Sequence, residues 1–138
     1  MNIIELQKQI VEEFSLFSDW MEKYEYLIEI GKALSPFPEA LKKEENLIAG
    51  CQSRVWLYTT MEDGKLFFLA DSDAIITKGI VSLLIRVFSG HSPQEILDAN
   101  IDFIDQIGLK DHLSPTRANG LLSMIKQIKA YAIAYQQQ

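Results

Sequence analysis

Cysteine is almost absent from this sequence, because the chain of 138 residues contains only Cys51. A single thiol excludes an internal disulfide, a Cys-x-x-Cys redox pair and any zinc or iron–sulfur site built from several cysteines. A lone thiol is typical of a reducing compartment, so we expect a cytoplasmic protein. Cys51 is also the one candidate that the chain offers for soft nucleophilic chemistry.

Long hydrophobic runs are missing as well. No segment reaches the roughly 18 uninterrupted apolar residues that a membrane span requires. The N-terminus turns acidic at Glu5 and lacks the basic start of a signal peptide. We therefore expect no membrane partner.

The chain has no excess of positive charge. It holds 13 basic and 19 acidic residues, a net charge of −6. A protein that binds nucleic acid through phosphates shows a surplus of Lys and Arg, so we expect no nucleic-acid partner. Residues 1–45 carry most of the imbalance, with 5 Lys against 10 acidic residues. This acidic front could steer a protein partner, although a solvated surface is the simpler interpretation.

What the sequence does contain is two helical regions around a region of strand character. Residues 53–61 and 65–70 are rich in β-branched and aromatic residues, and Asp63-Gly64 between them predicts a hairpin with a type I′ turn. The short run 46–48 could add a further strand. Elsewhere apolar residues recur at helical spacing. The predicted helices begin near Ile3, Asp19, Asp73, Ser92, Phe103 and Ser114.

These elements predict one domain over residues 1–138 of the α+β class. In it, a small antiparallel sheet of about three strands packs against several helices. The hairpin turn sets the strand register and pairs Val55 with Ser72. This register brings the loop that holds Cys51 toward Asp73, which we expect to cap the next helix.

The surroundings of Cys51 indicate a side chain that projects from a loop into an uncharged, partly apolar neighbourhood. Gly50 permits an unusual backbone conformation in front of the cysteine, and a strand begins directly after Arg54. Arg54 is the only charged residue between Asn46 and Met61, and a nearby cation lowers the pKa of a thiol. The residues alone also allow three other readings: a buried cysteine that acts as a small hydrophobe, a hydrolase that pairs Cys51 with His91 or His112, and an adaptor with an inert cysteine.

The stretch Gly50-Cys51-Gln52-Ser53-Arg54-Val55-Trp56 closely resembles the active-cysteine motif of the SufE family. The similarity covers nearly the whole chain in the same order. It continues through Asp19-Trp20 to Gly31, Ala70-Asp71-Ser72-Asp73-Ala74 with Lys78-Gly79, His112-Leu113-Ser114-Pro115-Thr116-Arg117, and Asn119-Gly120-Leu121.

This resemblance implies a SufE/IscU-like fold and a sulfur carrier of the SUF system, without independent turnover. Cys51 would form a persulfide with sulfur from a SufS-type cysteine desulfurase, whose pyridoxal phosphate belongs to that partner; the chain itself needs no cofactor and no metal. The acceptor would be a SufB-like scaffold (SufBCD) for iron–sulfur cluster assembly. The resemblance leaves open a SufS-like or a CsdA-like donor, and a monomer or a homodimer. The residues that it implies support the cysteine loop are Gly50, Gln52, Ser53, Arg54, Asp73 and Arg117.

Overall fold

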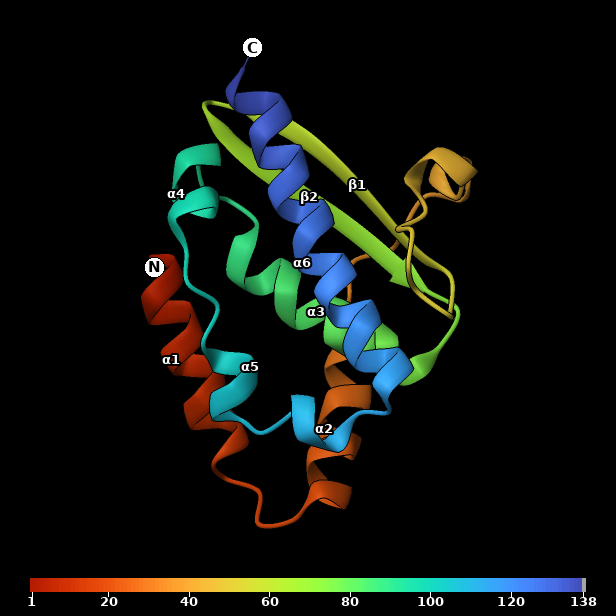
Figure 1. Ribbon diagram of the computed structural model, residues 1–138, viewed down its shortest axis with the longest axis vertical. Helices are drawn as coiled ribbons and strands as arrows, with labels where there is room; N and C mark the ends of the chain where they lie inside the picture. The colour runs from red at the N-terminus through yellow and green to blue at the C-terminus, as the bar shows by residue number, and fades with distance from the viewer. Residues whose placement is uncertain (138) are drawn as a thin grey trace.

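The computed structural model describes residues 1–137 and has the predicted α+β architecture, with one two-stranded antiparallel sheet among several helices (Figure 1). In chain order the elements are α1 (Ile3–Phe14), α2 (Trp20–Lys32), the 3-10 turns η1 (Glu39–Leu41) and η2 (Glu44–Asn46), β1 (Val55–Glu62), β2 (Lys65–Ser72), α3 (Ile75–Phe88), α4 (Pro93–Asp98), α5 (Phe103–Gln106), η3 (Lys110–His112) and α6 (Pro115–Gln136).

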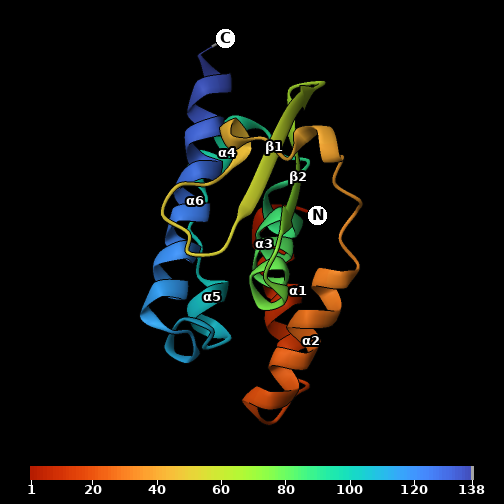
Figure 2. The same cartoon turned by 90° about the vertical axis from the view of Figure 1, so that its right-hand side faces the viewer.

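The elements lie in three layers. The hairpin and α3 form the middle layer, with α6 on one side and α2 on the other (Figure 2). In β2 every second residue is buried, as the side-chain period of two requires, whereas β1 begins with three consecutive buried residues, Val55, Trp56 and Leu57. The largest fully buried side chains of this core include Phe14, Leu57, Leu66, Phe88 and Phe103.

The hairpin is built as the sequence predicts. Asp63 and Gly64 both have positive φ, 50° and 78°, which is the requirement of a type I′ turn. The register pairs Val55 with Ser72, so the start of β1 lies beside the end of β2. This pairing places the loop before β1 next to the chain that enters α3.

Two local predictions are wrong. Residues 46–48 do not form a third strand. Leu47 makes a single antiparallel bridge to Trp56, because the segment comes directly out of the 3-10 turn η2 and runs beside β1 only briefly. Asp73 does not cap α3. Ala74 occupies the cap position without a side-chain hydrogen bond, because the Asp73 carboxylate is engaged by the backbone of Arg54.

The α2–α3 contact fixes the middle layer to one outer layer. Gly31 of α2 and Gly79 of α3 meet there, and a Cβ atom built on Gly79 would lie 2.2 Å from the carbonyl oxygen of Leu27. Further along α3, the Arg86 guanidinium donates to the Glu13 carboxylate of α1, which also accepts from the Tyr26 hydroxyl of α2. The Arg86 hydrogen bond keeps the pKa of Glu13 below its usual value.

Within residues 1–137, no helix combines the length and the hydrophobicity that crossing a bilayer demands.

Candidate functional site

Cys51 lies in the loop between η2 and β1, which reaches across to α6 (Figure 2). Its side chain is half-buried and adjoins a cavity of about 70 Å³. The walls come from the loop itself, the first turns of α3 and the first turns of α6. They are Cys51, Gln52, Ser53, Thr77, Ile80, Thr116, Arg117, Gly120 and Met124.

Backbone hydrogen bonds hold the two ends of this loop. At its start, the Ile48 N–H donates to the Val55 carbonyl at 2.9 Å. At its end, the Arg54 N–H donates to the Asp73 carboxylate at 3.1 Å, and the Asp73 N–H donates back to the Arg54 carbonyl at 3.3 Å. Asp73 therefore anchors the end of the cysteine loop to the segment that enters α3.

Gly50 allows the loop to lie directly on α6. It has φ of +89°, a left-handed conformation that side chains disfavour, and a Cβ atom there would lie 2.5 Å from the Ser123 hydroxyl oxygen. The positive φ therefore favours glycine before the cysteine, and the absence of a side chain there leaves the Ser123 hydroxyl in its place.

The setting of the thiol disfavours its ionisation. Its Sγ lies 3.6 Å from the Gly120 carbonyl oxygen, to which the S–H donates. Burial raises the pKa of Cys51. The expectation that Arg54 lowers this pKa is wrong, because the Arg54 side chain is exposed to solvent and contributes nothing to the shift. Ionisation of Cys51 in this position is disfavoured.

The structure gathers most of the residues predicted to support the loop. Gln52, Ser53 and Arg117 line the cavity, whereas Gly50 and Asp73 shape the loop from outside it, and Arg54 contributes backbone groups only. Sequence reasoning did not assign Thr77, Ile80, Thr116, Gly120 and Met124 to this site. Part of the signal was available, because residues 117, 120 and 124 have the spacing of one helix face.

Comparison with known proteins assigns the chain to a family. The family model described as "SufE: Fe-S metabolism associated domain" matches residues 8–132. The chain belongs to the SufE family. An uncharacterized SufE-like protein of Rhizobium meliloti is 44% identical over 130 residues, which cover 90% of this chain and 92% of the relative. A second, from Synechocystis, is 41% identical over 128 residues, which cover 93% of this chain and 80% of the relative.

The fold has a counterpart among solved structures. The solution structure of a hypothetical protein from Thermus thermophilus superimposes with a TM-score of 0.78 at 22% identity, and the match covers 96% of this chain and 97% of the other. At this identity the likeness concerns the fold. Membership of the SufE family assigns the chain to iron–sulfur metabolism.

Neither histidine of this SufE protein lines the cysteine cavity, so no imidazole stands beside the thiol. His91 is buried, with its ring nitrogens 3.3 Å from the Phe88 carbonyl and 3.1 Å from the Met1 carbonyl. His112 stacks on Trp20 with ring centroids 4.0 Å apart. A hydrolase needs a base within hydrogen-bond reach of its nucleophile, and this geometry does not provide one.

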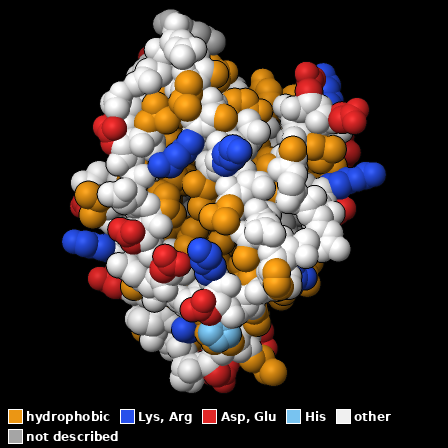
Figure 3. All heavy atoms as spheres, viewed as in Figure 1, with side chains coloured by type: hydrophobic (Ala, Val, Ile, Leu, Met, Phe, Trp, Pro, Cys, Tyr) orange, Lys and Arg blue, Asp and Glu red, His pale blue; other side chains and the backbone are white. Residues whose placement is uncertain are grey.

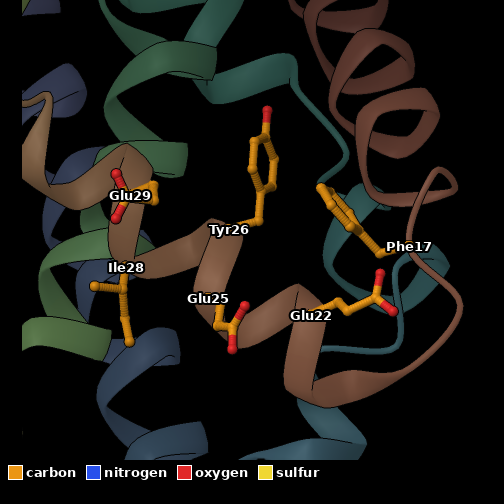
Figure 4. Close-up of a pocket in the computed structure, with 6 residues that line it drawn as sticks. All are labelled: Phe17, Glu22, Glu25, Tyr26, Ile28 and Glu29. Carbon is orange, nitrogen blue, oxygen red and sulfur yellow. The ribbon is translucent and has the colours of Figure 1, made fainter.

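Larger hollows lie elsewhere on the molecule and lack comparable chemistry. One of about 510 Å³ opens at the α1–α2 corner and is lined by Phe17, Tyr26, Ile28 and three glutamates of α2 (Figure 4). Another of about 520 Å³ lies between α1 and the α4–α5 segment. Neither contains a thiol, and no cluster of His, Cys, Asp and Glu within residues 1–137 is arranged to hold a metal ion.

The raised pKa predicts a slow thiol. At neutral pH the native protein should react with iodoacetamide more slowly than the same chain unfolded in urea, because thiolate is the attacking species and burial reduces its fraction. The native rate should rise with pH, with an inflection above the ordinary cysteine value near ~8.5. Alkylation followed by intact mass across a pH series measures both quantities. A native rate that matches the unfolded one would contradict the buried, neutral state of Cys51.

Proposed function

We propose that this protein accepts sulfur from a cysteine desulfurase onto Cys51 and delivers it to an iron–sulfur cluster scaffold. The observation that carries the proposal is the setting of the one thiol of a SufE-family chain. It stands on a glycine-hinged loop, beside a cavity with room for at least one further atom. The desulfurase is of the SufS type and acts in the cytoplasm as part of the SUF system.

The transfer is a thiol exchange that needs no external oxidant. The Cys51 thiolate attacks the terminal sulfur of the persulfide on the desulfurase. A new S–S bond forms, the old S–S bond breaks, and the desulfurase cysteine leaves as a thiolate that takes up a proton. Cys51 then carries the sulfur as a persulfide until a cysteine of a SufB-like scaffold attacks its terminal sulfur in the same way. Pyridoxal phosphate acts earlier, in the desulfurase, and the carrier has no turnover of its own.

The half-buried position of Cys51 beside the cavity, called here the closed position, suits holding a bound sulfur better than attacking the persulfide of the desulfurase. Exchange requires a thiolate and access to the sulfur that it attacks, and burial disfavours both. The loop therefore has to swing outward when the partner docks, with Gly50 as the flexible point and the Arg54–Asp73 pair as the fixed end. Gln52 and Ser53 move with the cysteine, while Arg117 stays at the cavity rim on α6.

The surface beside the loop supports a protein partner. The face that α6 crosses exposes hydrophobic side chains with Lys and Arg among them, and Asp and Glu side chains lie toward its edges (Figure 3). On α6 these include the exposed side chains of Leu122 and Ile133, and the helix carries Arg117, Lys126 and Lys129 but no acidic residue. Exposed apolar and basic side chains side by side on one helix are typical of a protein-docking surface.

Intact mass spectrometry tests the proposal. After incubation with a SufS-type desulfurase, pyridoxal phosphate and L-cysteine, the wild-type protein should gain the mass of sulfur, and a reductant should remove it. Cys51→Ser should gain none under the same turnover. A wild-type chain that stays unmodified while the desulfurase is active would overturn the proposal.

A further inference from the structure

The contact between Cys51 and α6 is made without any side chain from α6. Gly120 faces the cysteine, and a Cβ atom built on it would lie 3.6 Å from Sγ and 3.9 Å from the Cys51 Cα. Glycine is a poor residue for the interior of a helix, and α6 runs on for four further turns beyond it. The missing side chain therefore weakens the helix but leaves free volume directly beside the sulfur.

This free volume is continuous with the cavity of about 70 Å³ that Gly120 lines together with Thr77, Ile80 and Met124. Ile80 and Met124 are almost completely buried and give it an apolar floor. A persulfide places one more sulfur atom about 2.05 Å beyond Sγ. The cavity can take that atom, but it has no room for a larger disulfide partner such as a tripeptide thiol.

We propose that the space left by the absent side chain of Gly120 holds the terminal sulfur of the Cys51 persulfide. Gly120 is then a positioning residue for the loaded state: it allows the closed loop to shelter one sulfur atom from reductants in solution. This inference rests on the proposed function. Holding the sulfur forms and breaks no bond, because the persulfide is made by exchange before the loop closes.

The reduced and the loaded protein respond differently to a methyl group at this position. A Cβ atom 3.6 Å from Sγ is in ordinary van der Waals contact, so Gly120→Ala leaves the reduced thiol in its place. The same methyl group occupies volume that the additional sulfur needs. The loaded loop is therefore expected to open more often in Gly120→Ala than in the wild type.

The experiment compares persulfide lifetimes. Wild-type and Gly120→Ala proteins are loaded with a SufS-type desulfurase and L-cysteine, separated from both, and exposed to a fixed concentration of dithiothreitol while intact mass is followed. Attack on a sheltered group tracks its open population. The half-life should therefore fall roughly three- to tenfold in Gly120→Ala, whereas alkylation of the reduced thiol should stay at the wild-type rate.

Ala130→Gly is the matched control, since Ala130 is exposed on the same helix and far along it from the cavity. It weakens α6, while Gly120→Ala strengthens it, so helix stability alone predicts the opposite order of lifetimes. Equal lifetimes of wild type and Gly120→Ala after full loading would overturn the role of Gly120 and leave the carrier function standing. Faster alkylation of reduced Gly120→Ala would also overturn it, because the effect would then be general loosening. A wild type that never loads would overturn both proposals.

Discussion

Replacement of Gly79 by alanine is expected to destabilise the protein by roughly 3 kcal/mol, the upper part of the range for forcing extra atoms into a packed core. The added Cβ would lie 2.2 Å from the Leu27 carbonyl oxygen and 2.8 Å from its carbonyl carbon. Both are backbone atoms of α2, which cannot rotate away as the end of a side chain can. The helices α2 and α3 therefore have to separate.

Urea unfolding followed by circular dichroism measures this loss as a change in the free energy of unfolding. Gly64→Ala is the matched control. No atom lies within 4 Å of a Cβ built on Gly64, so that variant bears only the cost of its positive φ, about 1 kcal/mol. A Gly79→Ala protein as stable as the Gly64→Ala protein would show that the α2–α3 contact yields at little cost.

This contact also bears on the cysteine site. Thr77 and Ile80, on either side of Gly79, form the α3 wall of the cysteine cavity. Because α2 and α6 lie on opposite sides of α3, a shift of α3 away from α2 moves that wall toward the cysteine loop. We therefore expect any folded Gly79→Ala protein to show an altered rate of Cys51 alkylation as well as reduced stability.

Cys51→Ser is expected to return the turnover of a SufS-type desulfurase to the rate of the desulfurase alone. In a carrier, stimulation depends on removal of sulfur from the desulfurase persulfide, and a serine hydroxyl neither ionises near neutral pH nor takes up sulfane sulfur. The substitution exchanges sulfur for oxygen at a half-buried position, so the fold should persist. Sulfide release with and without the variant, in the presence of a reductant, measures the effect.

Two further measurements make this result decisive. Urea unfolding should give a similar free energy for Cys51→Ser and wild type, and titration calorimetry should show that both bind the desulfurase. If Cys51→Ser binds and still stimulates fully, the chain acts as an adaptor and its thiol is a bystander. Binding without stimulation separates the carrier from the adaptor.

Local sequence patterns predicted features that depend on neighbouring residues, but they did not predict the contact that anchors the cysteine loop. The hairpin register was predictable because a two-residue Asp-Gly turn leaves one pairing of the strands, and the structure has that pairing throughout. The helix starts at Ser92 and Ser114 were predictable for a similar reason, since in each the serine side chain caps the first turn of its own helix. The role of Asp73 could not be predicted in this way. Its carboxylate could cap its own helix or accept from the backbone of Arg54, 19 residues earlier in the sequence, and the structure shows the second.

Local turn geometry and composition are enough to predict the class of fold, the hairpin with its register, and Cys51 as the one thiol available for sulfur chemistry. Three other features follow only from how the whole chain folds: α3 and α6 pack around that thiol, burial and not Arg54 raises its pKa, and Gly120 lies against its sulfur. Those features arise where segments far apart in the chain pack together, and no local pattern specifies how such segments meet.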